Sequence, residues 1–153
     1  MSLVWTAIVL RMKTKLLVVI LAMLLATVVG CSRGNAPSTK TIDVSIDEVM
    51  NQSTVTREET LLVGNTLKVS LGSNHTTPFR WTAETKIGDP TILKQTSHEY
   101  QPPNTNRMGA PGNDVWTFVM LKAGTTTIVA NYASIVGSDT TPACTFTAKV
   151  TVR

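Results

Sequence analysis

The sequence predicts an all-β domain of the sandwich class, and two observations support this fold class. Several short segments alternate between apolar and polar residues, which places one side of each segment in a core and the other side in water. Threonine and β-branched residues are abundant, turn residues separate the segments at short spacing, and no long segment after residue 30 shows helical periodicity. No internal repeat is visible, and the part of the chain from Cys31 to Arg153 is long enough for one domain with its own core.

Three segments show the alternation most clearly, and each predicts a strand with one buried face. The residues predicted to face the core are Ile42, Val44 and Ile46 in the first segment, Leu67, Val69 and Leu71 in the second, and Phe146, Ala148, Val150 and Val152 in the third. Cys144 shares the parity of the third set. We therefore expect its side chain to point inward and to act as a small buried hydrophobe, not as a reactive thiol.

Residues 115–121 and 126–132 are apolar on both faces, which is typical of central strands. In the first of these runs, Trp116 and Phe118 share one side. A short segment that ends at Gly124 lies between the two runs. We therefore expect a hairpin of neighbouring central strands, with Gly124 at the turn position that requires a positive φ.

Residues 1–30 predict a secretory signal peptide. Lys13 and Lys15 form a short basic segment, and residues 16–29 that follow it are apolar apart from one threonine. This apolar run is shorter than the stretch of about 20 residues that a membrane-spanning helix needs. The run therefore indicates a cleaved export signal and not a permanent membrane span.

The sequence Val28-Val29-Gly30-Cys31, where this run ends, resembles the lipobox of bacterial lipoproteins. The resemblance implies that the signal is cut before Cys31 and that lipid on the Cys31 sulfur anchors the protein to a membrane. Stable anchoring takes more than one acyl chain. Because Ser32 is not the aspartate associated with inner-membrane retention, we expect the outer membrane of a bacterial cell envelope, facing the periplasm or the cell surface. An ordinary cleaved signal with an incidental cysteine is the alternative.

The expected domain organisation follows from this cleavage site. Residues 31–40 would comprise the lipidated cysteine and a flexible tether, because they are small and polar without apolar periodicity. The folded domain would span residues 41–153. The whole chain has a net charge of +4, but three of its 14 basic residues lie in the signal, which leaves 11 against 10 acidic residues. No basic patch remains, so nucleic acid is not an expected partner.

The residues that usually carry enzyme chemistry are sparse. His75 and His98 are the only histidines, and neither paired cysteines nor a His-x-x-x-His spacing suggests a zinc site. A glycine-rich phosphate loop and a Gly-x-Ser-x-Gly motif are also absent from the sequence. Composition alone leaves open a Ser-His-Asp triad, whose members can lie far apart in sequence. We interpret both histidines as polar loop residues and expect no metal, no cofactor and no enzymatic activity.

A polar loop between two strands is the feature most relevant to function. One strand ends at Leu71, the loop occupies residues 74–78, and Phe79 and Trp81 face the same way at the start of the next strand. Pro78 fixes its own φ and favours an extended conformation for the residue before it. The loop is thus partly preorganised, which reduces the entropy lost when it binds a partner.

The motif Asn-x-Thr-Thr-x-Phe-x-Trp, from Asn74 to Trp81, resembles the Asn-Pro-Thr-Thr-Gly-Tyr/Phe-x-Trp signature of the chagasin-like cysteine-protease inhibitors. Upstream, residues 63–71 are similar to the strand that leads into this loop. Downstream, Gly109-Ala110-Pro111-Gly112 is similar to the family's second, glycine-rich loop, and an aromatic strand and a Gly-Thr turn follow it. The resemblance covers about residues 41–153.

This resemblance implies an immunoglobulin-like β-sandwich that binds a papain-like cysteine protease without a cofactor. Three loops at one end would form a wedge in the enzyme's cleft, with the first loop covering the catalytic cysteine without acting as a substrate. The protease-binding residues that it implies are Asn74, Thr76, Thr77, Pro78 and Phe79 in the first loop, and Gly109 and Gly112 in the second. Trp81 would belong to the core. We expect the protein to be a monomer.

Three departures from the family pattern bear on this function. His75 replaces the usual proline, and Pro78 replaces the usual glycine. In the third loop the family usually has Arg-Pro-Trp soon after a strand-end tyrosine, whereas this chain has Tyr-Ala-Ser-Ile-Val-Gly at residues 132–137. Such anchors often contribute about 2 kcal/mol or more each to an interface, so we expect weaker or altered inhibition. The alternative function is a non-inhibitory, lipid-anchored binding or structural protein of the cell envelope.

Overall fold

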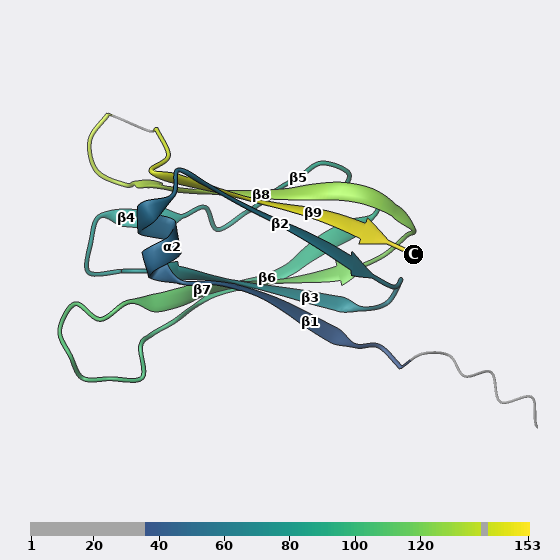
Figure 1. The fold of residues 1–153 in the computed structure, drawn as a ribbon, viewed down its shortest axis with the longest axis horizontal. Coiled ribbons are helices and arrows are strands. Elements are labelled where there is room, and N and C mark those ends of the chain that lie inside the picture. The colour runs from purple at the N-terminus through teal and green to yellow at the C-terminus, as the bar shows by residue number, and fades with distance from the viewer. Residues whose placement is uncertain (1–35, 139–140) are drawn as a thin grey trace, which may run out of the picture. The chain divides into compact units, whose positions relative to one another are not determined.

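Two β-sheets packed face to face form the fold in the computed structural model, which describes residues 36–138 and 141–153 (Figure 1). The first sheet has the strand order β1 (Thr39–Val44), β3 (Thr66–Ser73), β7 (Gly112–Met120) and β6 (Leu93–Gln101). The second has the order β2 (Thr54–Leu61), β9 (Cys144–Val152), β8 (Gly124–Ser134) and β4 (Phe79–Trp81), and β5 (Lys86–Ile87) also pairs with β8. The predicted all-β sandwich is confirmed.

The start of the domain contributes one strand to each sheet. β1 pairs in parallel with β3, and β2 pairs in parallel with β9, whereas all other pairs are antiparallel. β1 begins at Thr39, and the Ser38 carbonyl accepts a hydrogen bond from the Thr66 N–H at 2.9 Å. The ordered sheet therefore starts inside the range 31–40 that was predicted as tether. The predicted signal peptide and Cys31 lie outside the described residues.

Between β1 and β2 the chain forms the short helix α2 (Ile46–Asn51). The Ser45 side chain caps it by accepting a hydrogen bond from the Glu48 N–H at 3.2 Å, which satisfies one of the unpaired amides of the first turn. The prediction that Ile46 continues the first strand was wrong, because β1 ends at Val44. Within the described part of the chain, no helix has the length and apolar character needed to cross a membrane.

The predicted hairpin of β7 and β8 was also wrong, because the two strands lie in different sheets. The segment between them crosses from one layer to the other, and Gly124, with φ 153°, is the first residue of β8 instead of the turn residue of a hairpin. Each strand is nevertheless central: β7 lies between β3 and β6, and β8 lies between β9 and β4. The apolar residues on both faces of each strand correctly predicted its central position in a sheet, but they did not predict which strand it pairs with.

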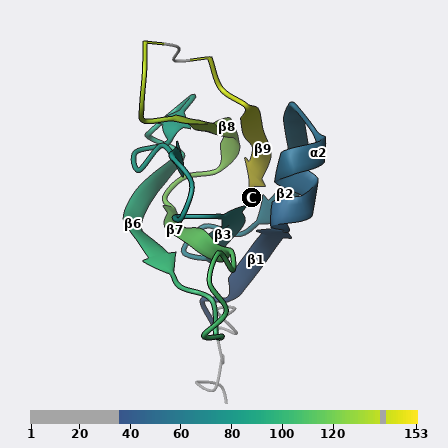
Figure 2. The same cartoon turned by 90° about the vertical axis from the view of Figure 1, so that its left-hand side faces the viewer.

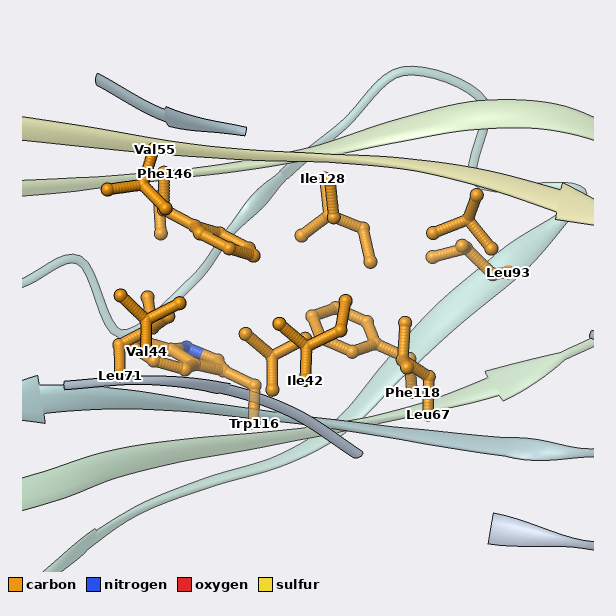
Figure 3. Close-up of a cluster of buried hydrophobic side chains, with 14 of the residues drawn as sticks. Ile42, Val44, Val55, Leu67, Leu71, Leu93, Trp116, Phe118, Ile128 and Phe146 are labelled. Carbon is orange, nitrogen blue, oxygen red and sulfur yellow. The ribbon is translucent and has the colours of Figure 1, made fainter. Parts of the chain in front are cut away.

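The core lies between the sheets (Figure 3). Trp116 and Phe118 of β7 point toward Ile128 and Phe146 of the opposite sheet, and all four are buried. The inward faces predicted from alternation are confirmed for the strands, with every predicted member of β1, β3 and β9 buried. Cys144 is buried as predicted, and burial raises the pKa of its thiol, so the unreactive thiol form is favoured.

Candidate functional site

Three loops gather at one end of the sandwich (Figure 1), and Figure 2 views the molecule from that end. The first loop (74–78) joins β3 to β4, the second loop (102–111) joins β6 to β7, and the third loop (135–143, with 139–140 not described) joins β8 to β9. Strand register explains why they meet, since Ser73 pairs with Gly112 and Phe79 pairs with Ser134. The loops therefore leave their strands at matching heights.

Side chains of the first loop hold its backbone in a turn. The Asn74 Oδ1 accepts hydrogen bonds from the Thr76 N–H at 3.0 Å and from the Thr76 hydroxyl at 2.7 Å. The Thr77 hydroxyl donates to the Asn74 carbonyl at 2.8 Å and accepts from the Phe79 N–H at 3.3 Å. This pattern is an Asx turn followed by a threonine turn. Thr76 and Pro78 remain exposed at the tip.

Arg80 braces the same loop from its base, although sequence reasoning gave it no role. Its guanidinium donates to the carbonyls of Thr77 and Phe79 at 2.6 Å each, and to the carbonyl of His75 at 2.9 Å. A fork of fixed N–H groups suits several carbonyls at once. The signal in the sequence was an arginine two residues after the loop, on the opposite side of the strand from Phe79 and Trp81.

The first loop is bonded to both of the other loops. The Asn74 side-chain amide donates to the Gly109 carbonyl of the second loop at 3.1 Å. The Ile135 N–H of the third loop donates to the Pro78 carbonyl at 2.9 Å. The structure thus brings the predicted residues Asn74, Pro78 and Gly109 into one connected surface.

A buried carboxylate between two histidines ties the first loop to the first sheet. The Asp114 side chain is only 3% exposed, and its two oxygens lie 3.2 Å from His75 Nε2 and 2.8 Å from His98 Nε2. The His75 ring stacks on Tyr100 with ring centroids 3.5 Å apart, and the His98 ring lies 4.6 Å from Trp116. These contacts satisfy the carboxylate and hold the loop side chain in place.

This cluster corrects the interpretation that both histidines are loop residues. His98 lies in β6, so the prediction that it is a loop residue was wrong. His75 does lie in the first loop, but its ring is held by Asp114 and Tyr100. In the described ranges neither imidazole hydrogen-bonds a serine or cysteine, and no group of metal-ligating side chains is arranged to hold an ion. The arrangement therefore braces a loop.

The two predicted glycines of the second loop occupy different places. Gly109 lies near the tip with φ 77°, a left-handed conformation that favours glycine, and a Cβ there would meet nothing within 4 Å. Gly112 is buried at the neck of the loop, where a Cβ would lie 2.2 Å from the Gln101 carbonyl oxygen. Only Gly109 is placed where a partner could reach it. Met108 beside it is fully exposed.

The third loop carries apolar side chains at its start. Ile135 and Val136 are 65% and 66% exposed, at the positions where the sequence lacks an aromatic or cationic anchor. They lie next to the first loop, because the Ile135 N–H bonds the Pro78 carbonyl. The start of the third loop therefore presents an apolar surface beside the first loop.

Below the first loop, the aromatic residues extend the core toward this end. Trp81 is buried, as predicted, and its indole N–H donates to the Gly72 carbonyl at 3.0 Å. Phe79 is half-buried and lies against Tyr132, with ring centroids 5.7 Å apart. A cavity of about 350 Å³ opens beside these rings and is lined by Ile46 and Met50 of α2, by Thr77 and Pro78, and by Phe79 and Tyr132.

The fold is thus a β-sandwich with three loops at one end, the first of which is hydrogen-bonded to each of the other two. The chain belongs to the chagasin family of peptidase inhibitors, since the family model described as "Chagasin family peptidase inhibitor I42" matches residues 60–150. Members of this family are inhibitors and not enzymes. The predicted family resemblance is confirmed.

Solved structures with the same fold agree with this assignment. The cysteine protease inhibitor EhICP2 from Entamoeba histolytica is 19% identical, with a TM-score of 0.58 over 78% of this chain and 100% of that chain. PbICP-C, in a complex with falcipain-2, is 20% identical, with a TM-score of 0.56 over 76% of this chain and 99% of that chain. Comparison with curated proteins gives no significant match.

Proposed function

We propose that the protein inhibits papain-like cysteine proteases by filling their active-site cleft with the three loops. The observation that carries this proposal is that the first loop is hydrogen-bonded to both of the others, through Asn74 and Pro78. Separate flexible loops would each lose conformational entropy on entering a cleft, which weakens binding. Hydrogen bonds between the loops reduce this cost, because they order the loops before the enzyme binds. The family assignment supports peptidase inhibition, and the structural neighbours include a cysteine protease inhibitor and a complex with falcipain-2.

Inhibition of this kind is occlusion and involves no chemical step. Thr76 and Pro78 are the exposed residues of the first loop and would meet the enzyme first. Asn74 and Thr77 face inward and keep the turn closed through their own hydrogen bonds. A turn held in this way does not relax into the extended conformation that a protease binds as substrate, so the chain is expected to stay intact.

The apolar side chains on the other two loops would form the contacts with the cleft walls. Met108 projects from the second loop, and Ile135 and Val136 project from the third. Ile135 and Val136 replace the third loop's cationic and aromatic anchor with apolar contacts, whose strength depends on buried area and little on salt. This chain would therefore favour proteases with apolar cleft walls.

The test is a titration of papain and of a cathepsin-type protease with residues 32–153, which contain the compact unit Pro37–Arg153. We expect reversible inhibition at micromolar concentration or below, an inhibition constant that changes little between low and high salt, and an intact chain by mass spectrometry after long incubation. No inhibition at micromolar concentration would contradict the proposal. That result would favour the alternative, a non-inhibitory envelope protein, which the missing third-loop anchor also fits.

We also propose that the protein acts from a bacterial cell envelope, held by lipid on Cys31. The support is the sequence alone: a basic segment, a short apolar run and Val28-Val29-Gly30-Cys31. With its own signal in a bacterial host, the protein should incorporate labelled palmitate and sediment with membranes. Cys31→Ser should abolish both. The anchor would be contradicted if the Cys31→Ser protein sediments with membranes as well as the parent does and the parent incorporates no labelled palmitate.

A further inference from the structure

The helix α2 lies beside the first loop although it is outside the part of the chain that the family model matches. The match covers residues 60–150, whereas α2 spans Ile46–Asn51. Figure 2 shows α2 at the same end of the sandwich as the loops. The helix is therefore a feature of this chain that borders the wedge without belonging to the three loops.

Two contacts fix the position of α2. The Glu48 carboxylate accepts two hydrogen bonds from one Arg57 guanidinium nitrogen of β2, at 2.6 and 2.9 Å. On its other side the backbone of β3 approaches so closely that a Cβ on Gly72 would lie 2.2 Å from the Ile46 nitrogen. An ion pair and a direct backbone contact leave little freedom for the helix to shift.

The space that remains between α2 and the first loop is the cavity of about 350 Å³. The aromatic rings of Phe79 and Tyr132 line it, and Met50 and Pro78 at its edge are both exposed. Met50 is 69% exposed, so its side chain is accessible to a partner at the mouth of the cavity. An apolar cavity with a flexible thioether beside it suits a single apolar side chain from a partner.

We propose that this cavity is a fourth contact with the bound protease and takes up an apolar side chain from the rim of the enzyme's cleft. The inference rests on the proposed inhibitory function. The cavity is continuous with the proposed protease-binding surface, because Thr77 and Pro78 line the cavity and also belong to the loop that would enter the cleft. An enzyme seated on the first loop covers the cavity mouth, and filling it removes apolar surface from water.

Substitution of Met50 tests the contact by affinity. In residues 32–153, Met50→Glu should raise the dissociation constant for papain about tenfold or more, because a carboxylate cannot enter an apolar contact without losing its hydration. Met50→Leu should stay within about twofold of the parent, since it keeps the apolar volume. Val63→Glu is the matched control: Val63 is an exposed apolar residue in the β2–β3 turn, at the opposite end, and its change should leave affinity unaltered.

Methionine methyl NMR separates this inference from the proposed function. After residue 31 the chain has three methionines, which report on three places: Met50 at the cavity, Met108 on the second loop and Met120 in the core. On addition of active-site-blocked papain that keeps an open cleft, the Met50 and Met108 signals should shift and Met120 should not. A shift of Met108 without Met50, or equal affinity of Met50→Glu and the parent, overturns the fourth contact alone. No binding and no shift of either overturns both proposals.

Discussion

Replacing Trp116 with alanine should lower the free energy of unfolding by about 3–5 kcal/mol, the usual cost of removing a large aromatic side chain from a packed core. Trp116 is fully buried, lies edge-on to Trp81 with ring centroids 6.4 Å apart, and stacks on His98. Its indole N–H also donates to the Ala83 carbonyl at 2.9 Å, so the substitution leaves an acceptor without its partner. Chemical denaturation of residues 32–153, followed by circular dichroism, measures the change.

The control for this experiment is Val136→Ala, which removes apolar atoms from an exposed side chain and should change stability by less than about 0.5 kcal/mol. A second variant, Trp116→Phe, keeps most of the apolar volume but not the N–H. It should fall between the parent and Trp116→Ala. A loss below about 1 kcal/mol for Trp116→Ala would contradict the position of this side chain at the centre of the core.

Replacing Asn74 with alanine should weaken protease inhibition by about 30-fold, which corresponds to about 2 kcal/mol. The alanine removes two acceptor bonds from Thr76 and the donor bond to the Gly109 carbonyl. The first loop then loses its Asx turn and its link to the second loop, although the Thr77 bonds to the Asn74 carbonyl remain. The loosened segments would have to be ordered again on binding. The measurement is the inhibition constant against papain, together with the midpoint of thermal unfolding, which should change little for a surface loop.

Asn74→Asp separates the two roles of this side chain. Aspartate keeps an acceptor for the two Thr76 bonds but places a carboxylate oxygen where the amide donated to the Gly109 carbonyl. If the link between the loops matters, this variant should inhibit clearly less well than the parent while keeping the same fold. If Asn74→Asp and the parent inhibit equally, only the turn matters, and the loops need not be joined.

Alternation in the sequence predicted the inward face of most strands, because the direction of each side chain depends only on local parity. The same pattern did not identify the partner of a strand. β7 and β8 are consecutive and apolar, yet they lie in opposite sheets, since pairing depends on contacts distant in the sequence. The helix α2 was missed because six residues are too few to show a helical period, and its start at Ile46 continued an alternating run.

In the candidate site, too, contacts between near neighbours in the sequence could be predicted, whereas contacts between distant residues could not. The turn of the first loop was predictable because Asn74, Thr76 and Thr77 interact with near neighbours. The Asp114 cluster was not predictable, since it joins residues 39 and 16 positions away through the register of β3, β7 and β6. Asp114 sits next to a predicted aromatic strand, and nothing in the chain marks it as the partner of two histidines.

The parallel pairing of β1 with β3 determines the end of the sandwich at which the chain enters the domain. Thr39 pairs with Thr66, which pairs with Val119, while Ser73 and Gly112 mark the far end of the same sheet, where the loops emerge. The polypeptide thus joins the sandwich at the pole away from the wedge (Figure 1). If the proposed lipid on Cys31 holds the protein, the chain enters the domain at the end opposite the loops, so the attachment does not cover them. A diffusing enzyme could then be captured without the domain being released.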